Sequence, residues 1–187
     1  YYTSVTQVDK AIGKVFDLLE AYGYADNTVV VLTSDHGEML GSKQRSGKTC
    51  FYEDSVHIPF IIQGAGIPRG EHRTQLGEQV DILPTLLGLC GAEGEEAFPG
   101  KSLLPVINDP DVCQKNFVHG WLDRSGYRHQ MVRSERYKLY RVFSNRKDVQ
   151  PKEAIELYDL IEDPYETHNL WPNELPADID PLIAEFD

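Results

Sequence analysis

Apolar residues recur at helical spacing over the first two dozen positions of the chain. They fall three or four residues apart, at Val5, Val8, Ile12, Val15 and Leu19. This spacing predicts an amphipathic helix with one packed face, and Gly23 indicates its end. Residues 28–33 then contain an apolar run with no polar alternation. Such a run is typical of a strand buried on both faces, usually in a parallel sheet, so the start of the chain predicts an α/β unit.

Further along, the pattern predicts a second buried strand within residues 56–64 and a helix over about 79–90. In that helix we expect Pro84 in the first turn and an inward face formed by Val80, Leu83, Leu86 and Leu87. From Lys115 onward, short segments rich in Val, Tyr and Phe alternate with turn residues, which predicts a small antiparallel sheet. Its expected core comprises Trp121, Tyr137, Tyr140 and Tyr158. A last short helix is expected from about Ile179.

Composition narrows the class of protein. With 187 residues, 41% of them hydrophobic and 26% charged, the chain resembles an ordinary globular protein. Its net charge of −12 argues against nonspecific binding to nucleic acid. No apolar run approaches the roughly 20 residues that span a bilayer, so we expect neither a nucleic-acid partner nor a membrane span. The chain starts at Tyr1 without a preceding methionine, and we interpret it as part of a longer sequence.

Candidate chemistry begins where the first predicted strand ends, at Asp35 and His36. A carboxylate and an imidazole can both bind a divalent metal, although Asp and Gly after a strand are also common turn formers. A polar loop of about 15 residues follows and contains Lys43, Arg45 and Lys48. A metal and a cationic side chain near one strand end form a site for an anion. The alternative is that these cations are simply surface residues.

Five segments together resemble the sulfatase family of the alkaline phosphatase superfamily. They are "ADNTVVVLTSDHGEMLG", "GKTCFYEDSVHIPFII", "QVDILPTLLGL", "PGKSLLPVI" and the pair "RSERYKLY" with "ELYDLIEDPYETHNL". The resemblance covers nearly the whole chain and corresponds to the carboxyl half of such an enzyme. It implies an α/β fold that is part of an alkaline-phosphatase-like sandwich sheet with helices, over residues 1–112. It also implies a small C-terminal antiparallel sheet subdomain over residues 113–187.

The resemblance implies roles for five residues. Asp35 and His36 match the family's ligands for a divalent cation, usually calcium. Lys48, ahead of Tyr52 and Glu53, matches the lysine that contacts the substrate sulfate, and we assign it a catalytic and substrate-binding role. Lys43 and Arg45 are expected to border the substrate pocket, although "GSKQ" stands where family members often have "GDHG" or "GEHG". The implied substrate is a sulfate ester of a small molecule or saccharide.

The family's nucleophile is a formylglycine made from Cys or Ser in a Cys/Ser-X-Pro/Ala-X-Arg motif near the amino terminus. None of Cys50, Cys90 and Cys113 has that context, and their odd number argues against a disulfide framework. We therefore expect the formylglycine and the other metal ligands on an amino-terminal half that acts as partner to this chain, which alone would be inactive and unstable. The alternatives are a phosphonate or phosphate ester hydrolase of the same superfamily and a noncatalytic scaffold. His57 and Asp81 are interpreted as structural.

Overall fold

The computed structural model describes residues 1–92, 98–144, 146, 148 and 153–186. The chain divides into two units, one formed by Tyr1–Thr33 with Phe60–Glu71 and the other by Ser34–Pro59 with His72–Asp187. The predicted boundary between residues 112 and 113 stays a prediction. Among the described residues, no helix has both the length and the apolar character needed to cross a membrane.

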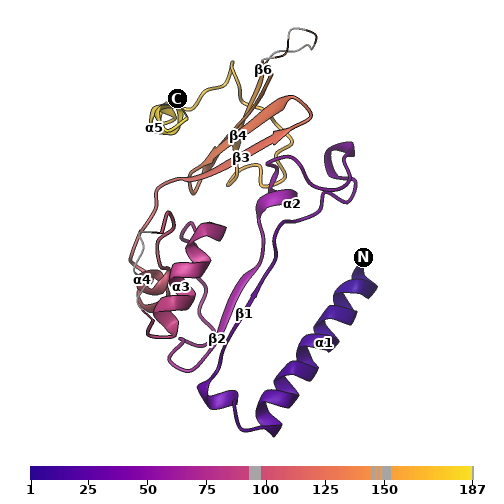
Figure 1. Ribbon diagram of the computed structural model, residues 1–187. Helices are drawn as coiled ribbons and strands as arrows, with labels where there is room; N and C mark the ends of the chain where they lie inside the picture. The colour runs from indigo at the N-terminus through magenta and orange to yellow at the C-terminus, as the bar shows by residue number, and fades with distance from the viewer. Residues whose placement is uncertain (93–97, 145, 147, 149–152, 187) are drawn as a thin grey trace. The chain divides into compact units, whose positions relative to one another are not determined.

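The first unit contains the predicted helix and both predicted strands. Helix α1 (Tyr2–Ala21) and the 3₁₀ turn η1 (Ala25–Asn27) precede strand β1 (Val29–Thr33), which pairs with β2 (Phe60–Gly64). The pairing is antiparallel, from Val29 opposite Gly64 to Thr33 opposite Phe60, and the strands run side by side in Figure 1.

The expectations of a parallel sheet and of burial on both faces were wrong for this strand pair. Leu32 is 38% exposed, and α1 has no buried residue. An unbroken apolar run indicates that neither face of a strand needs to contact water. It does not determine whether the neighbouring strand is parallel or antiparallel. Among the described residues, β1 and β2 form a sheet of two strands only, and such a ribbon leaves much of its surface uncovered.

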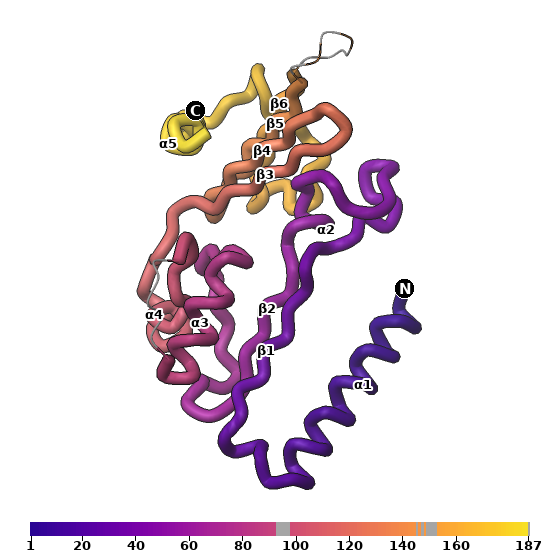
Figure 2. Tube along the Cα trace, in the orientation of Figure 1, coloured from indigo at the N-terminus to yellow at the C-terminus, as the bar shows by residue number. Residues whose placement is uncertain are grey.

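The second unit is built around the predicted antiparallel sheet, which the structure confirms. Its strands β3 (Val118–Arg124), β4 (Tyr127–Arg133), β5 (Tyr137–Phe143) and β6 (Glu153–Asp159) are neighbours in chain order (Figure 2).

Two hydrophobic clusters bury the faces of this sheet. One joins Met39, Cys50 and Tyr52 from the long loop to Tyr140 and Tyr158 of the sheet. The other joins sheet residues to the predicted last helix, α5 (Asp180–Ala184), and comprises Val132, Tyr137, Leu139, Leu157, Ile179 and Leu182.

Trp121 does not belong to either cluster. The prediction that it lies in the core was wrong, because it sits on edge strand β3 and is 66% exposed.

Short helical segments complete the second unit. They are η2 (Ser42–Gln44), α2 (Glu53–Val56), η3 (Gln79–Asp81), α3 (Ile82–Leu89) and α4 (Leu104–Asn108). Pro84 lies in the first turn of α3, as predicted. The inward face expected for this region was wrong: Val80, Leu83 and Leu86 are exposed, whereas Asp81 and Thr85 are buried. A polar network, rather than an apolar stripe, holds this face against the rest of the unit.

Candidate functional site

The turn after β1 is held together by short-range hydrogen bonds. The Ser34 hydroxyl donates to the His36 carbonyl oxygen at 2.8 Å, and the His36 backbone N–H donates to Asp35 Oδ1 at 3.0 Å. Gly37 then donates its N–H to the Ser55 carbonyl oxygen at 2.8 Å. A Cβ atom on Gly37 would lie 2.0 Å from the Asp54 carbonyl oxygen, so only glycine allows this approach. The turn is therefore fixed against α2.

His36 presents one ring nitrogen as an acceptor. Its Nδ1 lies 2.8 Å from the Gly37 carbonyl oxygen, which can only accept a hydrogen bond, so Nδ1 carries the proton. The lone pair of a neutral ring is then on Nε2, which lies 3.2 Å from Asp35 Oδ2. A backbone carbonyl that fixes the tautomer in this way is the usual support of a metal-binding histidine.

Asp35 keeps its carboxylate accessible and ionised. Its side chain is 82% exposed, so solvent reaches the Oδ2 atom beside His36. Partial loss of solvent tends to raise its pKa, but the hydrogen bond from the His36 N–H and the nearby charge of Lys48 hold the pKa of Asp35 below its ordinary value. The carboxylate is thus in the form that binds a cation.

The loop between Met39 and Gly47 places Lys48 next to the turn that carries Asp35 and His36. The Met39 N–H donates to the Gly47 carbonyl oxygen at 2.8 Å, and the Gly47 N–H donates to the Glu38 carboxylate. Met39 is buried against the sheet and anchors one end of the loop. The result is that Lys48 Nζ contacts His36 Nε2. The structure thus brings Asp35, His36 and Lys48 together.

Lys43 and Arg45 lie elsewhere on the loop. The Lys43 ammonium contacts the Glu166 carbonyl oxygen and lies 5.4 Å from the ring centroid of Tyr52 and 5.6 Å from that of Tyr158. The Arg45 guanidinium lies 5.8 Å from the Tyr52 centroid. Both cations therefore stack on Tyr52 of the loop, and Lys43 also stacks on Tyr158 of the sheet. Their assignment as pocket residues stays a prediction.

The donor pair fits part of a metal site. Neighbouring donors in an octahedral shell with bonds of about 2.1 to 2.4 Å lie about 3 to 3.4 Å apart, and the Asp35–His36 separation of 3.2 Å falls in that range. Over the described residues, however, no group of three or more His, Cys, Asp or Glu side chains could hold a metal ion. Among the described residues this turn therefore offers two donors at most, fewer than the full shell of a divalent metal.

A buried ion cluster behind the loop was not identified from the sequence. Lys138 is fully buried and contacts the carboxylates of Glu53, at 2.8 Å, and Glu166. Glu53 also receives Arg133 and His57, each at 3.3 Å, and the structural role of His57 stays a prediction. Although burial acts to raise it, the hydrogen bond from His57 and the charge of Lys138 hold the pKa of Glu53 at about 2. The Tyr52–Glu53 pair was the sequence signal that could have identified this cluster, but the pair was used only to match Lys48 to the family motif.

A second set of missed residues supports the turn from the other side. Gln79 donates its amide to the carbonyl oxygens of Ser34, at 3.1 Å, and of Asp35. Asp81, predicted to be structural, is fully buried and completes a capping box with Glu78, which confirms the prediction. Lys115 pairs with both carboxylates. No sequence motif connects Lys115 to this region, because the contact spans more than thirty residues.

The three cysteines are free thiols. Cys50 is buried in the cluster beneath the loop, whereas Cys90 and Cys113 are exposed.

Comparison with known proteins identifies the family. The family model described as Sulfatase matches residues 1–92. Arylsulfatase K of Canis lupus familiaris is 31% identical over 182 residues, which cover 91% of this chain and 32% of that protein. A solved structure of a protein with its substrate D-glucosamine-2-N,6-O-disulfate is similar with a TM-score of 0.85 and 28% identity, covering 100% of this chain and 38% of the other. The phosphonate monoester hydrolase of Agrobacterium radiobacter is similar with a TM-score of 0.77 and 25% identity, at the same two coverages.

The mixed α/β fold and these likenesses define a protein of the alkaline phosphatase superfamily. Within that superfamily, the chain belongs to the sulfatase family, as its motifs predicted. It spans about a third of the length of the relatives that it matches.

Proposed function

We propose that this chain contributes to the active site of a sulfuric ester hydrolase. In this proposal Asp35 and His36 bind a divalent metal, and Lys48 binds the sulfate group. The observation that carries the proposal is the meeting of three side chains at one turn: an ionised carboxylate, an imidazole with its lone pair on Nε2, and an ammonium group.

The contact between Lys48 and His36 suggests how the site responds to a metal. The Nε2 lone pair accepts one partner at a time, and Lys48 occupies it in this structure. If Nε2 held a metal, the Lys48 ammonium would lose this partner and would need another acceptor nearby. A sulfate ester oxygen meets that need, and Lys48 then neutralises negative charge on the transferring group.

The cofactors follow from the same argument. The metal, which we propose to be calcium, supplies Lewis-acid polarisation of a sulfate oxygen. The formylglycine nucleophile and the remaining ligands are proposed to come from an amino-terminal half outside these 187 residues. Neither the exposed cysteines nor buried Cys50 has the required motif, so this chain alone is proposed to be inactive.

The proposed substrate class is a sulfated small molecule or saccharide. Support comes from the similar structure that was solved with a disulfated glucosamine as its substrate. Lys43 and Arg45 are proposed to border the pocket and to take part in selecting the substrate. Because Lys43 is stacked on Tyr52 and Tyr158, it can select the substrate only if the loop moves or if its stacking sets the shape of the loop around the pocket.

A phosphonate or phosphate ester hydrolase is the second candidate. The likeness to a phosphonate monoester hydrolase supports it. So does the mixed donor pair, because imidazole suits zinc better than it suits calcium, which prefers oxygen ligands. A noncatalytic scaffold is the third candidate.

The test is a comparison of esters on the intact protein that contains this chain. Nitrophenyl sulfate and the nitrophenyl ester of phenylphosphonate are assayed after metal removal and after addition of Ca²⁺ or Mn²⁺. Faster turnover of the sulfate ester with Ca²⁺ supports the proposed function. Faster turnover of the phosphonate with Mn²⁺ favours the second candidate, and no turnover of either ester under any condition favours the scaffold.

A further inference from the structure

The side chain of Gln79 bridges the backbone of the turn that carries the proposed metal ligands. Its Nε2 donates to the carbonyl oxygens of Ser34 and Asp35. Because both partners are acceptors, the amide nitrogen must face them, which fixes the orientation of the side chain. Asp35 itself has an exposed side chain and therefore gains little from packing. Its position depends on how its backbone is held.

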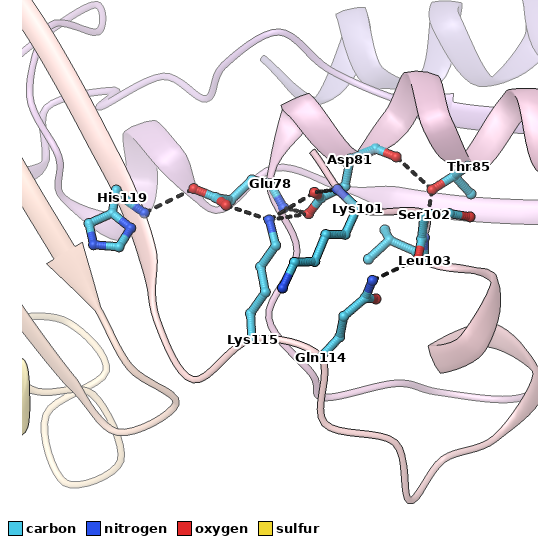
Figure 3. A network of polar contacts seen from close by, with 9 residues as sticks. All are labelled: Glu78, Asp81, Thr85, Lys101, Ser102, Leu103, Gln114, Lys115 and His119. Carbon is cyan, nitrogen blue, oxygen red and sulfur yellow. Dashed lines mark hydrogen bonds and ion pairs between the residues drawn. The ribbon is translucent and has the colours of Figure 1, made fainter. Parts of the chain in front are cut away.

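A buried polar network holds Glu78 and Asp81, which flank Gln79 in the chain (Figure 3). The Glu78 N–H donates to Asp81 Oδ2 at 2.8 Å, and Lys115 Nζ lies 2.8 Å and 2.7 Å from the two Asp81 carboxylate oxygens. Glu78 accepts from Lys115 and from the His119 N–H at 2.9 Å. Asp81 is fully buried and the Lys115 side chain is 11% exposed, so water weakens these interactions little.

The same network connects three distant parts of the chain. Asp81 Oδ1 accepts the Lys101 N–H at 2.8 Å, and Thr85 links the Asp81 carbonyl oxygen, at 2.6 Å, to the Leu103 N–H, at 2.8 Å. A Cβ atom on Gly100 would lie 1.9 Å from the Val80 carbonyl oxygen, so the 100–103 segment is pressed against η3. The base from which Gln79 extends is therefore rigid.

We propose that Gln79 is a positioning residue for the proposed metal site and acts through the backbone of Ser34 and Asp35. The inference rests on the proposed function, because it assumes that Asp35 and His36 bind a metal. Gly37 holds the far side of the turn through its bond to Ser55, while Gln79 holds the near side. Without the Gln79 amide, the backbone of Ser34 and Asp35 becomes more mobile. Binding one metal ion through Asp35 and His36 then costs more conformational entropy.

The test measures metal affinity in the intact protein with a matched pair of variants. Q79M keeps the length of the side chain but removes the donor to the turn. Q114M removes an equivalent bond of the same network, from Gln114 Nε2 to the Ser102 carbonyl oxygen at 3.0 Å, which does not touch the turn. Calorimetric titration of each metal-free variant with Mn²⁺ and Ca²⁺ gives Kd, and thermal unfolding without metal gives the stability of each.

We expect Q79M to raise the metal Kd by about ten- to hundredfold. Q114M should leave Kd within about twofold of the unsubstituted protein, although both variants lower Tm to a similar extent. An unchanged Kd in Q79M, or an equal rise in Q114M, overturns the inference.

D35N separates the inference from the proposed function. Tight metal binding that D35N abolishes and Q79M leaves unchanged overturns the positioning role alone. Metal binding that D35N does not alter, or no metal binding at all, overturns both.

Discussion

Lys48 Nζ contacts Nε2 of His36, twelve residues earlier in the chain. The contact depends on a loop that closes between Met39 and Gly47 and on a ring whose other nitrogen is bound to the Gly37 carbonyl oxygen. The ammonium group of Lys48, the proposed sulfate-binding residue, therefore contacts the His36 lone pair that is proposed to bind the metal.

Substitution K48A should remove catalysis and leave metal binding intact. We expect kcat/KM of the intact protein for a sulfate ester to fall by about 10² to 10³, the usual effect of losing one group that stabilises transition-state charge. The metal Kd should stay the same or decrease, because Nε2 loses its competing partner. Steady-state kinetics and calorimetric titration measure the two effects.

The control for this substitution is K14A on exposed α1. Its rate should match that of the unsubstituted protein. A K48A rate within about threefold of that protein would show that Lys48 is not part of the catalytic site.

Substitution G37A should destabilise the protein because the new Cβ meets the Asp54 carbonyl oxygen at 2.0 Å. Backbone must shift to relieve the overlap, and we expect a loss of at least about 1 to 3 kcal/mol in the free energy of unfolding. Gly13 offers a matched control with the opposite sign, since it lies inside α1 with nothing near its Cβ position. G13A should stabilise by about 0.5 to 1 kcal/mol. Urea unfolding measures both, and equal effects would contradict the steric argument.

Glu53 should make stability depend on acid pH. Its pKa is about 2 in the folded chain and 4.5 ordinarily, so the unfolded state takes up its proton first as the pH falls. The stability from Glu53 is therefore fully present above about pH 4.5 and is lost as the pH falls toward 2. E53Q should lower stability at neutral pH and reduce the slope of stability against pH in that window.

Urea unfolding at a series of pH values measures this slope, and E20Q on α1 is the control for the loss of one carboxylate. The slope of E20Q should match that of the unsubstituted protein. If E53Q and E20Q show the same slope between pH 4.5 and 2, the ion cluster does not hold Glu53 in its charged form.

Lys138 should be among the most sensitive positions of the second unit. It is fully buried between Glu53, whose side chain is 16% exposed, and the buried Glu166, so K138M leaves both carboxylates without their shared cation. We expect a loss of about 3 to 5 kcal/mol in the free energy of unfolding. The variant K138M/E53Q/E166Q should recover part of this loss, because the uncompensated charges are gone. A loss below about 1 kcal/mol for K138M alone would contradict this account.

Local pattern was sufficient for several elements of this protein. Helical periodicity predicted α1, and clusters of Val, Tyr and Phe between turn residues predicted a small antiparallel sheet, which the structure shows with four strands. The position of Asp35 and His36 directly after a strand, with Lys48 a dozen residues later, is likewise written in the chain. These features are local because each depends on spacing along the backbone, which the order of residues sets directly.

Tertiary structure decided the rest, because it depends on which distant segments meet. Contacts between distant segments set the antiparallel pairing of β1 with β2 and the exposure of Trp121. They also decide that Asp81 is buried and Leu83 is not, and local patterns do not predict such contacts. The bonds from Gln79 to the Ser34 and Asp35 carbonyl oxygens, and the clamp of Lys115 on Asp81, join residues more than thirty positions apart. The sequence alone determined which side chains could bind a metal and an anion, and the folded chain decided how firmly they are held, since rigidity comes from long-range contacts.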